Sequence, residues 1–596
     1  MEDSPINLTI ANLHKRFSEE SYSPEDMVNE IYDRIESGDP KIWISLVSRE
    51  ESLQRAKQLS EQKIEDLPLF GVPFAIKDNI DLEGLRTTAA CEEYGYFPSE
   101  SAFVVDRLIA AGAIPIGKTN LDQFATGLVG VRSHYGFPGN SFNPDYIPGG
   151  SSSGSAVSVS AGMVSFSLGT DTAGSGRVPA SLNNLVGLKP SRGVFSNRGP
   201  IPACKSLDCI SVFALNCDDA RTVFDVAAEF DVEDGFSRQM DPPECSAPTM
   251  KIGVPLPSQL EFFGDSATAR IFDDAVNHLI GLGYEVIPID FEPFSETARL
   301  LYEGPWLAER YIALEDVLND CPEILHPVTR SIIEGGNKYS ALDFFKTHYR
   351  IQELRQKAGV VMEQFDAIMA PTCPTVYTIA EVEADPVTLN SRLGTYTNFM
   401  NLMDLSGLAV PCGMRPDGLP HGVTFFAPAF HDYDLLELGA KFHAKTGLTA
   451  GAVGSPVPSE GKPTALSSEE RLSIVVCGAH MKGLPLNHQL TDLGAVFVEE
   501  TVTDAYYSLY AMEGEPARPA LVRQPEGGST IMVEVWSLPL KNVGTFLKGI
   551  GKPLGLGKIQ LIGGREEVGF IGESCAVEGA KDITALGSWR VQLFVL

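Results

Sequence analysis

Residues 149–179 are GGSSSGSAVSVSAGMVSFSLGTDTAGSGRVP, two runs of glycine and small polar residues around an apolar centre. The first run, taken alone, would indicate a flexible loop. It leads directly into residues 157–168, however, which predict a small-residue helix or a buried strand. Small residues let backbone N–H groups approach a ligand closely and permit unusual φ angles. The second run therefore predicts a nest of N–H groups able to hold an oxyanion, at Thr172, Ala173, Gly174 and Ser175.

Residues 150–154 also match G-x-S-x-G, the nucleophile elbow of α/β-hydrolases. That elbow requires a strand directly before it. Residues 143–148, NPDYIP, stand there instead and indicate a loop. We therefore exclude Ser152 as a nucleophile.

Helical and short apolar segments alternate on either side of this region. Residues 70–76 predict a buried strand that ends at Lys77, residues 103–111 predict a helix, and residues 113–117 predict the next strand. Residues 23–26, SPED, have the composition of a helix start. Further strands are expected at 251–254, 285–288 and 367–370, with a closing helix at 435–446. This alternation predicts an α/β fold with a largely buried sheet.

The composition changes near residue 450. We expect a first domain at 1–450, a linker at 451–467 rich in Gly, Pro, Ser and Thr, and a β-rich domain at 468–596. Strands are predicted in the last part at 472–476, 530–536, 558–562 and 590–595.

The chain is acidic, with 46 Lys+Arg against 78 Asp+Glu and a net charge of −32 over 596 residues. Nucleic-acid binding needs clustered basic residues, so the charge argues against it, and equally against an anionic membrane surface. An anionic substrate would need a local cation. The start has no signal-peptide pattern, no stretch is apolar enough to span a membrane, and the 10 cysteines show no disulfide or zinc spacing. We expect a cytoplasmic protein with reduced cysteines.

Residues 149–190, together with GVPFAIKD at 71–78, resemble the amidase signature family. That family uses a Ser–cis-Ser–Lys triad, and the resemblance implies Ser175 as nucleophile, Ser151 as bridging serine and Lys77 as base. The implied fold is a mixed sheet covered by helices on both faces. For residues 468–596 the implied fold is a β-rich domain like the γ-glutamylcyclotransferases.

The chemistry of a serine–lysine pair agrees with these assignments. A serine hydroxyl is a poor nucleophile until a base takes its proton. Lysine can be that base only if burial lowers its pKa well below the usual ~10.4. The apolar strand before Lys77 predicts such burial. Ser151 can pass the proton on, because a hydroxyl both donates and accepts hydrogen bonds.

Two departures from the common family pattern, Ala173 and Gly176, resemble the allophanate hydrolase subfamily, as does TTAAC at 87–91. We interpret Gly176 as opening space beside the nucleophile or accommodating a polar group. The resemblance implies that Tyr302 and Arg310 bind the substrate carboxylate and that Gly127 contacts the substrate through its backbone. Without the resemblance, Arg310 would be predicted to form a surface ion pair with Glu303 or Asp316.

The implied reaction is hydrolysis of allophanate through an acyl-Ser175 intermediate, releasing ammonia and N-carboxycarbamate, which loses CO2. No metal and no organic cofactor are implied. The alternative is a broader-specificity amidase, or the glutaminase subunit of a glutamyl-tRNA amidotransferase. The acidic chain and the Ala-Gly-Ser-Gly sequence at 173–176 argue against the glutaminase.

Residues 476–483 and 485–490 resemble the C-terminal domain of the same subfamily. Residues 540–550 lack the acid of the cyclotransferases, so that chemistry is not expected. His480 and His488 are candidates for proton transfer. This domain is a candidate either for a second catalytic step or for assembly. We expect the chain to form a homodimer or a larger assembly, and the C-terminal domain is one candidate for the interface.

Overall fold

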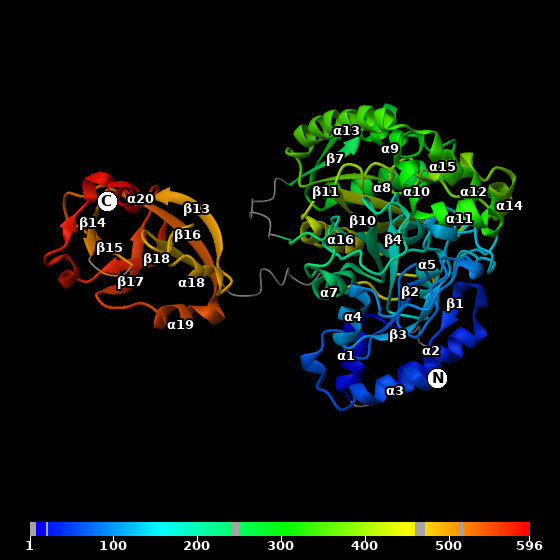
Figure 1. Ribbon diagram of the computed structural model, residues 1–596, viewed down its shortest axis with the longest axis horizontal. Coiled ribbons are helices and arrows are strands. Elements are labelled where there is room, and N and C mark those ends of the chain that lie inside the picture. The colour runs from blue at the N-terminus through cyan, green and yellow to red at the C-terminus, as the bar shows by residue number, and fades with distance from the viewer. Residues whose placement is uncertain are drawn as a thin grey trace. The chain divides into compact units, whose positions relative to one another are not determined.

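The computed structural model describes residues 7–19, 22–240, 250–458, 471–512, 514 and 516–595. Contacts within the chain divide it into two units, Met1–Lys462 and Pro463–Leu596 (Figure 1). Part of the predicted linker lies outside the described residues. Its beginning packs on the first unit, because Ala450 pairs with Ser455 and the amide of Gly451 donates to the carbonyl of Asn184.

The first unit contains a mixed sheet of 11 strands in the order β1-β3-β2-β4-β6-β5-β10-β11-β9-β7-β8. Parallel pairs join β2 to β3 and β4, and β7 to β8 and β9, whereas the pairs between β4 and β11 are antiparallel. The α/β fold and its mixed sheet are therefore confirmed. The strands are β1 (Trp43–Leu46), β2 (Pro73–Lys77), β3 (Ile114–Thr119), β4 (Phe166–Asp171), β5 (Val186–Lys189), β6 (Cys209–Ala214), β7 (Lys251–Pro255), β8 (Glu285–Ile289), β9 (Ala367–Pro371), β10 (Leu405–Met414) and β11 (Pro420–Pro428).

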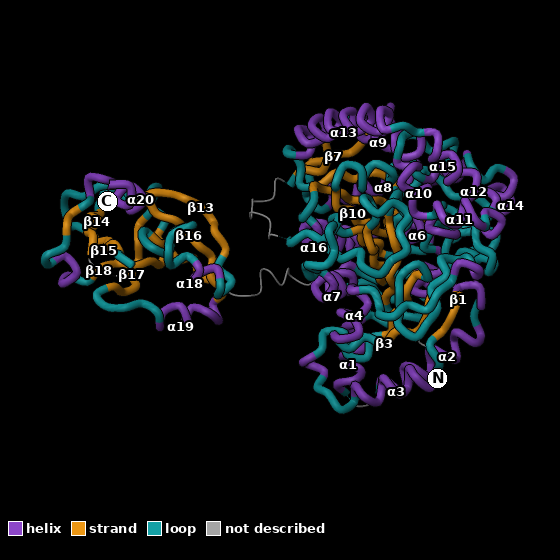
Figure 2. Tube along the Cα trace, viewed as in Figure 1, coloured by secondary structure: helices purple, strands orange, loops and turns teal. Residues whose placement is uncertain are grey.

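Helices cover both faces of this sheet (Figure 2). Side chains alternate between the faces of a strand, and β2 shows it: Phe74 and Ile76 belong to one apolar core, Ala75 to another. The helices are α1 (Ile10–Ser18), α2 (Pro24–Ser37), α3 (Arg49–Leu59), α4 (Phe103–Ala110), α5 (Ser153–Ser160), α6 (Val178–Leu182), α7 (Cys217–Ala227), α8 (Ser266–Gly281), α9 (Glu292–Glu303), α10 (Trp306–Ala313), α11 (Glu315–Asp320), α12 (Pro327–Glu334), α13 (Ala341–Met362), α14 (Ile379–Ala384), α15 (Thr388–Leu393) and α16 (Asp432–Thr446).

The predicted helix start at residues 23–26 is confirmed by a capping box. The hydroxyl of Ser23 accepts from the amide of Asp26, and the Asp26 carboxylate accepts from the amide of Ser23. Residues 157–168 contain both elements that the sequence left open. The end of α5 lies in this segment, and β4 begins at Phe166.

The second unit is β-rich, as predicted. A sheet in the order β13-β16-β12-β18-β17 lies with a smaller one in the order β15-β14-β19. Its strands are β12 (Arg471–Val476), β13 (Val496–Val502), β14 (Tyr507–Met512), β15 (Arg518–Arg523), β16 (Met532–Pro539), β17 (Leu554–Gln560), β18 (Glu566–Gly572) and β19 (Lys581–Asp582), and its helices are α18 (His488–Thr491), α19 (Leu540–Lys548) and α20 (Trp589–Val595).

The strand predicted at residues 590–595 is wrong, because this segment is the helix α20. Trp589 and Gln592, three residues apart, are both buried. That spacing is one helical turn, whereas in a strand it would place them on opposite faces. The hydroxyl of Ser588 accepts from the amide of Arg590 at the helix start.

Across the described ranges, every helix is too short or too polar to cross a bilayer.

Candidate active site

Lys77 is the last residue of β2, and its side chain is fully buried. Its Nζ atom donates to Oγ of Ser151 at 2.7 Å and to Oγ1 of Thr170, also at 2.7 Å. The structure thus brings the predicted base and the predicted bridging serine into direct contact. Thr170, near the end of the neighbouring strand β4, was not predicted as a partner.

Burial lowers the pKa of Lys77 from its ordinary value of 10.5 to about 7. The carboxylates of Asp122, Asp171 and Asp208 oppose this change, and the charge of Arg310 adds to it. A lysine with this pKa is substantially neutral near pH 7, so it can accept a proton.

Ser151 lies at the turn before α5, and the peptide bond between Gly150 and Ser151 is cis. The turn is held on both sides. The amide of Gly150 donates to the carbonyl of Leu128 at 2.8 Å, and the carbonyl of Ser151 accepts from the amide of Asp122 at 3.0 Å. No strand precedes this turn, and Oγ of Ser152 donates to the carbonyl of Thr170 instead. The exclusion of the nucleophile-elbow interpretation agrees with this geometry.

Ser175 lies in the loop between β4 and α6 and is 4% exposed. Its Oγ donates to the carbonyl of Gly127 at 3.5 Å, which joins the predicted nucleophile to the predicted substrate contact. Within the described part of the chain, no hydrogen bond joins the hydroxyls of Ser175 and Ser151. Catalytic hydrogen bonds are often long without substrate and tighten in the reacting complex.

The loop around Ser175 folds onto the carboxylate of Asp171. The amides of Gly174 and Gly176 donate to Oδ1 and Oδ2 of Asp171 at 2.7 and 3.0 Å. The guanidinium of Arg177 donates to the same two oxygens at 3.0 and 2.9 Å. Asp171 therefore fixes the backbone on both sides of Ser175.

This arrangement corrects one part of the predicted oxyanion nest. The amide of Gly174 is engaged by Asp171, so this residue positions the loop and is not a donor to the substrate. The amides of Thr172, Ala173 and Ser175 donate to no acceptor among the described residues. These three remain candidates for the oxyanion site.

Two roles were considered for Gly176, opening space beside the nucleophile and accommodating a polar group, and the structure supports the second. A Cβ atom at this position would lie 2.5 Å from Cβ and 2.6 Å from Oγ of Ser211. No side chain fits there, because the neighbouring strand β6 occupies the space. Gly176 thus accommodates the polar side chain of Ser211 and does not open room beside the nucleophile.

Arg310, on α10, is only 3% exposed. Its Nη1 donates to Oγ1 of Thr126 at 3.1 Å, and its guanidinium carbon lies 5.7 Å from the ring centre of Tyr302. No described carboxylate lies within 4.0 Å of this guanidinium, so the ion pair considered from sequence is wrong. Glu303 and Asp316 are both exposed, whereas Arg310 points inward.

Chain contacts link the predicted substrate residues to the nucleophile. Thr126 binds Arg310 through its side chain, and the next residue, Gly127, accepts from Ser175. The structure therefore brings Tyr302, Arg310, Gly127 and Ser175 together. No described cluster of three or more His, Cys, Asp or Glu side chains could hold a metal ion there.

Comparison with known proteins places this site in a family. Residues 26–436 match the family model "Amidase". The chain belongs to the amidase family.

Residues 472–593 of this amidase match a second model, "Allophanate hydrolase C-terminal domain". A solved allophanate hydrolase from Kluyveromyces lactis is 41% identical, with a TM-score of 0.76, over 99% of this chain and 100% of that one. The urea amidolyase of Saccharomyces cerevisiae is 45% identical over 93% of this chain. This amidase spans about a third of that relative, 31% of its length. A glutamyl-tRNA(Gln) amidotransferase subunit from an Exiguobacterium species is 32% identical over 74% of this chain and 97% of the relative.

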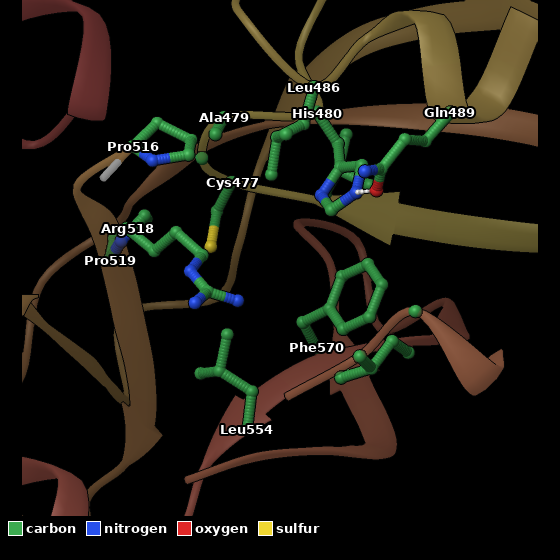
Figure 3. Close-up of a pocket in the computed structure, with 14 residues that line it drawn as sticks. Cys477, Ala479, His480, Leu486, Gln489, Pro516, Arg518, Pro519, Leu554 and Phe570 are labelled. Atoms are coloured by element: carbon green, nitrogen blue, oxygen red, sulfur yellow. Dashed lines mark hydrogen bonds between the residues drawn. The ribbon is translucent and has the colours of Figure 1, made fainter. Parts of the chain in front are cut away.

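The C-terminal unit of the amidase has a cavity of its own, of about 170 Å³ (Figure 3). His480 and Arg518 line it together with Cys477, Gln489 and Phe570. Nε2 of His480 lies 3.0 Å from Oε1 of Gln489, and the imidazole stacks on Phe570. Burial lowers the pKa of His480, so its ring is neutral near pH 7. His488 is exposed and lies outside this cavity.

Proposed function

We propose that this amidase hydrolyses allophanate, a urea that carries a carboxylate. The observation that carries the proposal is Arg310: a buried guanidinium with no described carboxylate partner, linked through Thr126 and Gly127 to Ser175. The carboxylates of Asp208 and Glu309 act on this guanidinium without contacting it, and a bound carboxylate can supply a direct partner. The similarity to the K. lactis allophanate hydrolase supports the same substrate.

The proposed first half-reaction forms an acyl enzyme. Oγ of Ser175 attacks the terminal amide carbon, and its proton passes through Ser151 to neutral Lys77. Negative charge on the carbonyl oxygen is stabilised by the amides of Thr172, Ala173 and Ser175. The C–N bond then breaks, and the proton returns through Ser151 to the leaving nitrogen, which departs as ammonia.

Water completes the cycle. Lys77, neutral again, accepts a proton from water through Ser151 as the water attacks the acyl carbon. The bond to Oγ of Ser175 breaks, and the proton returns to that oxygen. The product is N-carboxycarbamate, a dicarboxylate that loses CO2. The transfer between Ser151 and Lys77 uses two groups that the structure already joins, at 2.7 Å.

Ammonia release from allophanate by the purified chain tests this proposal. The alternatives are a broader amidase and a glutaminase subunit. The first predicts turnover of a simple amide, and the second turnover of glutamine, at a rate equal to or above that of allophanate. Either result would reject allophanate as the preferred substrate.

A second proposal concerns the cavity of the C-terminal unit. We propose that it binds N-carboxycarbamate and promotes loss of CO2. Arg518 supplies a cation suited to a carboxylate, in a cavity that the neutral imidazole of His480 also lines. In the full chain, Arg518→Met should leave ammonia release intact and let N-carboxycarbamate accumulate, visible by carbon-13 NMR. Unchanged product with a changed mass in solution would instead assign the unit to assembly.

We also propose that the chain self-associates through the outer face of α13. Leu342, Phe345 and Tyr349 recur at helical spacing and are 71%, 51% and 63% exposed. Adjacent exposed apolar side chains of this size are typical of interfaces. The double variant Phe345→Ser with Tyr349→Ser should halve the mass measured by light scattering. Removal of the C-terminal unit would halve it if assembly used that unit.

We propose a cytoplasmic location. The 9 cysteines of the described residues are all free thiols, which fits a reducing compartment. Localisation of the tagged chain in cells tests this.

A further inference from the structure

Asp122 has a fully buried carboxylate that no step of the proposed mechanism uses. It precedes the short helix η4 (Gln123–Ala125). Oδ2 accepts from the amide of Gly130 and Oδ1 from the amide of Arg132, both at 2.9 Å. No described lysine, arginine or histidine nitrogen lies within 4.0 Å of it. The charge is therefore held by backbone N–H groups and not by an ion pair.

This carboxylate is packed against two glycines of the active site. A Cβ atom on Gly127 would lie 2.5 Å from Oδ2 of Asp122, and one on Gly150 would lie 2.1 Å from the same oxygen. The amide of Asp122 also donates to the carbonyl of Ser151. One side chain thus separates the turn that carries the bridging serine from the carbonyl that accepts from Ser175.

The charges around Lys77 single out the same residue. Three carboxylates favour the protonated lysine, those of Asp122, Asp171 and Asp208, and Arg310 opposes them. Asp171 is neutralised by its two bonds to Arg177, and Asp208 accepts from the hydroxyl of Thr172 and lies near Arg310. Asp122 lies near the guanidinium of Arg132 without forming an ion pair with it, and it is the largest of the three influences on Lys77.

We propose that Asp122 is a positioning residue that sets the spacing between the Ser151 turn and Gly127 and supplies the negative field that keeps Lys77 able to hold a proton. This rests on the proposed role of Lys77 as base. The two effects act on different steps of one cycle. The spacing aligns Ser151 with Ser175. The field keeps Lys77 basic enough to take the serine proton, because a lysine with a lower pKa is a weaker base.

The test is the pH dependence of kcat/KM for ammonia release from allophanate. In Asp122→Asn the acid limb should move to lower pH by about one unit, because a negative charge near the ammonium is lost. The value of kcat should fall about 10- to 100-fold, since a displacement of about 1 Å in the reacting groups has that effect. An unchanged midpoint would overturn the electrostatic role.

Asp122→Glu separates charge from position. It keeps the negative charge but adds a methylene where Gly127 and Gly150 leave no room, so the midpoint should stay within about 0.3 pH unit while kcat falls about tenfold. Full wild-type kcat in this variant would overturn the positioning role. If Asp122→Asn does not fold, Asp122→Glu still tests the positioning role by itself.

Asp432→Asn is the matched control. Asp432 is equally buried and accepts two hydrogen bonds from Ser191, but it is not among the charges that act on Lys77. It should lower thermal stability without moving the pH midpoint. A midpoint that moves equally in both variants would show a general effect of losing buried charge and overturn the proposal. Absence of allophanate turnover by the wild type at every pH would instead reject the proposed function.

Discussion

The guanidinium of Arg310 donates to the hydroxyl of Thr126 at 3.1 Å. Thr126 directly precedes Gly127, whose carbonyl accepts from Ser175. The arginine proposed to bind substrate and the serine proposed as nucleophile are therefore joined through two consecutive residues. A substrate whose carboxylate binds Arg310 would therefore have its carbonyl carbon positioned near the hydroxyl of Ser175.

Arg310→Met tests this link, because methionine keeps much of the apolar stem and removes the charge. We expect KM for allophanate to rise about 10- to 100-fold, the cost of a lost charged hydrogen bond. Hydrolysis of a neutral amide that lacks a carboxylate should change far less. An equal loss for both substrates would show that Arg310 supports the fold and does not select the anion.

Ser175→Ala should lower kcat at least about 10³-fold, by analogy with loss of the nucleophile in other hydrolases. Ser152→Ala is the matched control in the same glycine-rich region. Its hydroxyl donates to the carbonyl of Thr170 and takes no part in the proposed reaction. The same hydroxyl accepts from the amide of Thr170 at 3.4 Å. Activity within about tenfold of wild type is expected, because the variant loses these two buried hydrogen bonds and no reacting group. If Ser152→Ala abolished turnover and Ser175→Ala kept it, Ser152 would be the nucleophile and the assignment would be wrong.

The triad is implied by the family resemblance, and local pattern supports one part of it. The apolar residues before Lys77 predict its burial, which the structure confirms, and its contact with Ser151 agrees with the proposed roles. Gly174 was assigned to the oxyanion because sequence does not reveal which acceptor claims an amide, and here Asp171 claims it. Asp122 was missed because its partners are backbone groups supplied by folded loops.

The same limits explain the errors in element type and environment. An apolar segment without clear alternation, such as residues 590–595, does not distinguish a strand from a short helix. Arg310 shows that sequence does not reveal the environment of a charged side chain. Without the family resemblance, its acidic neighbours in sequence would predict an exposed ion pair. The packing of α10 shows instead that the side chain is buried.

The pKa of Lys77, about 7, predicts the direction of the pH dependence. The neutral amine is the base, and it is lost as pH falls through the pKa. We expect kcat/KM to rise with pH up to about 7 and then level off, with about a tenfold fall per unit well below it. Lys77→Arg keeps a charge that is not lost in this range, so its residual activity should show no such limb. If kcat/KM of that variant still fell at low pH, the titration would belong to a group other than Lys77.

Gly176→Ala should destabilise the first unit, since the added methyl meets Cβ and Oγ of Ser211 at 2.5 and 2.6 Å. We expect a cost of about 1–3 kcal/mol, seen as a lower unfolding midpoint in a thermal or urea experiment. Ser211→Gly removes both atoms that clash, so the double variant should recover most of the loss, and the non-additivity measures the contact directly. If Gly176 served to leave room for substrate, the outcome would differ: KM would rise, the midpoint would stay unchanged, and the change at Ser211 would rescue nothing.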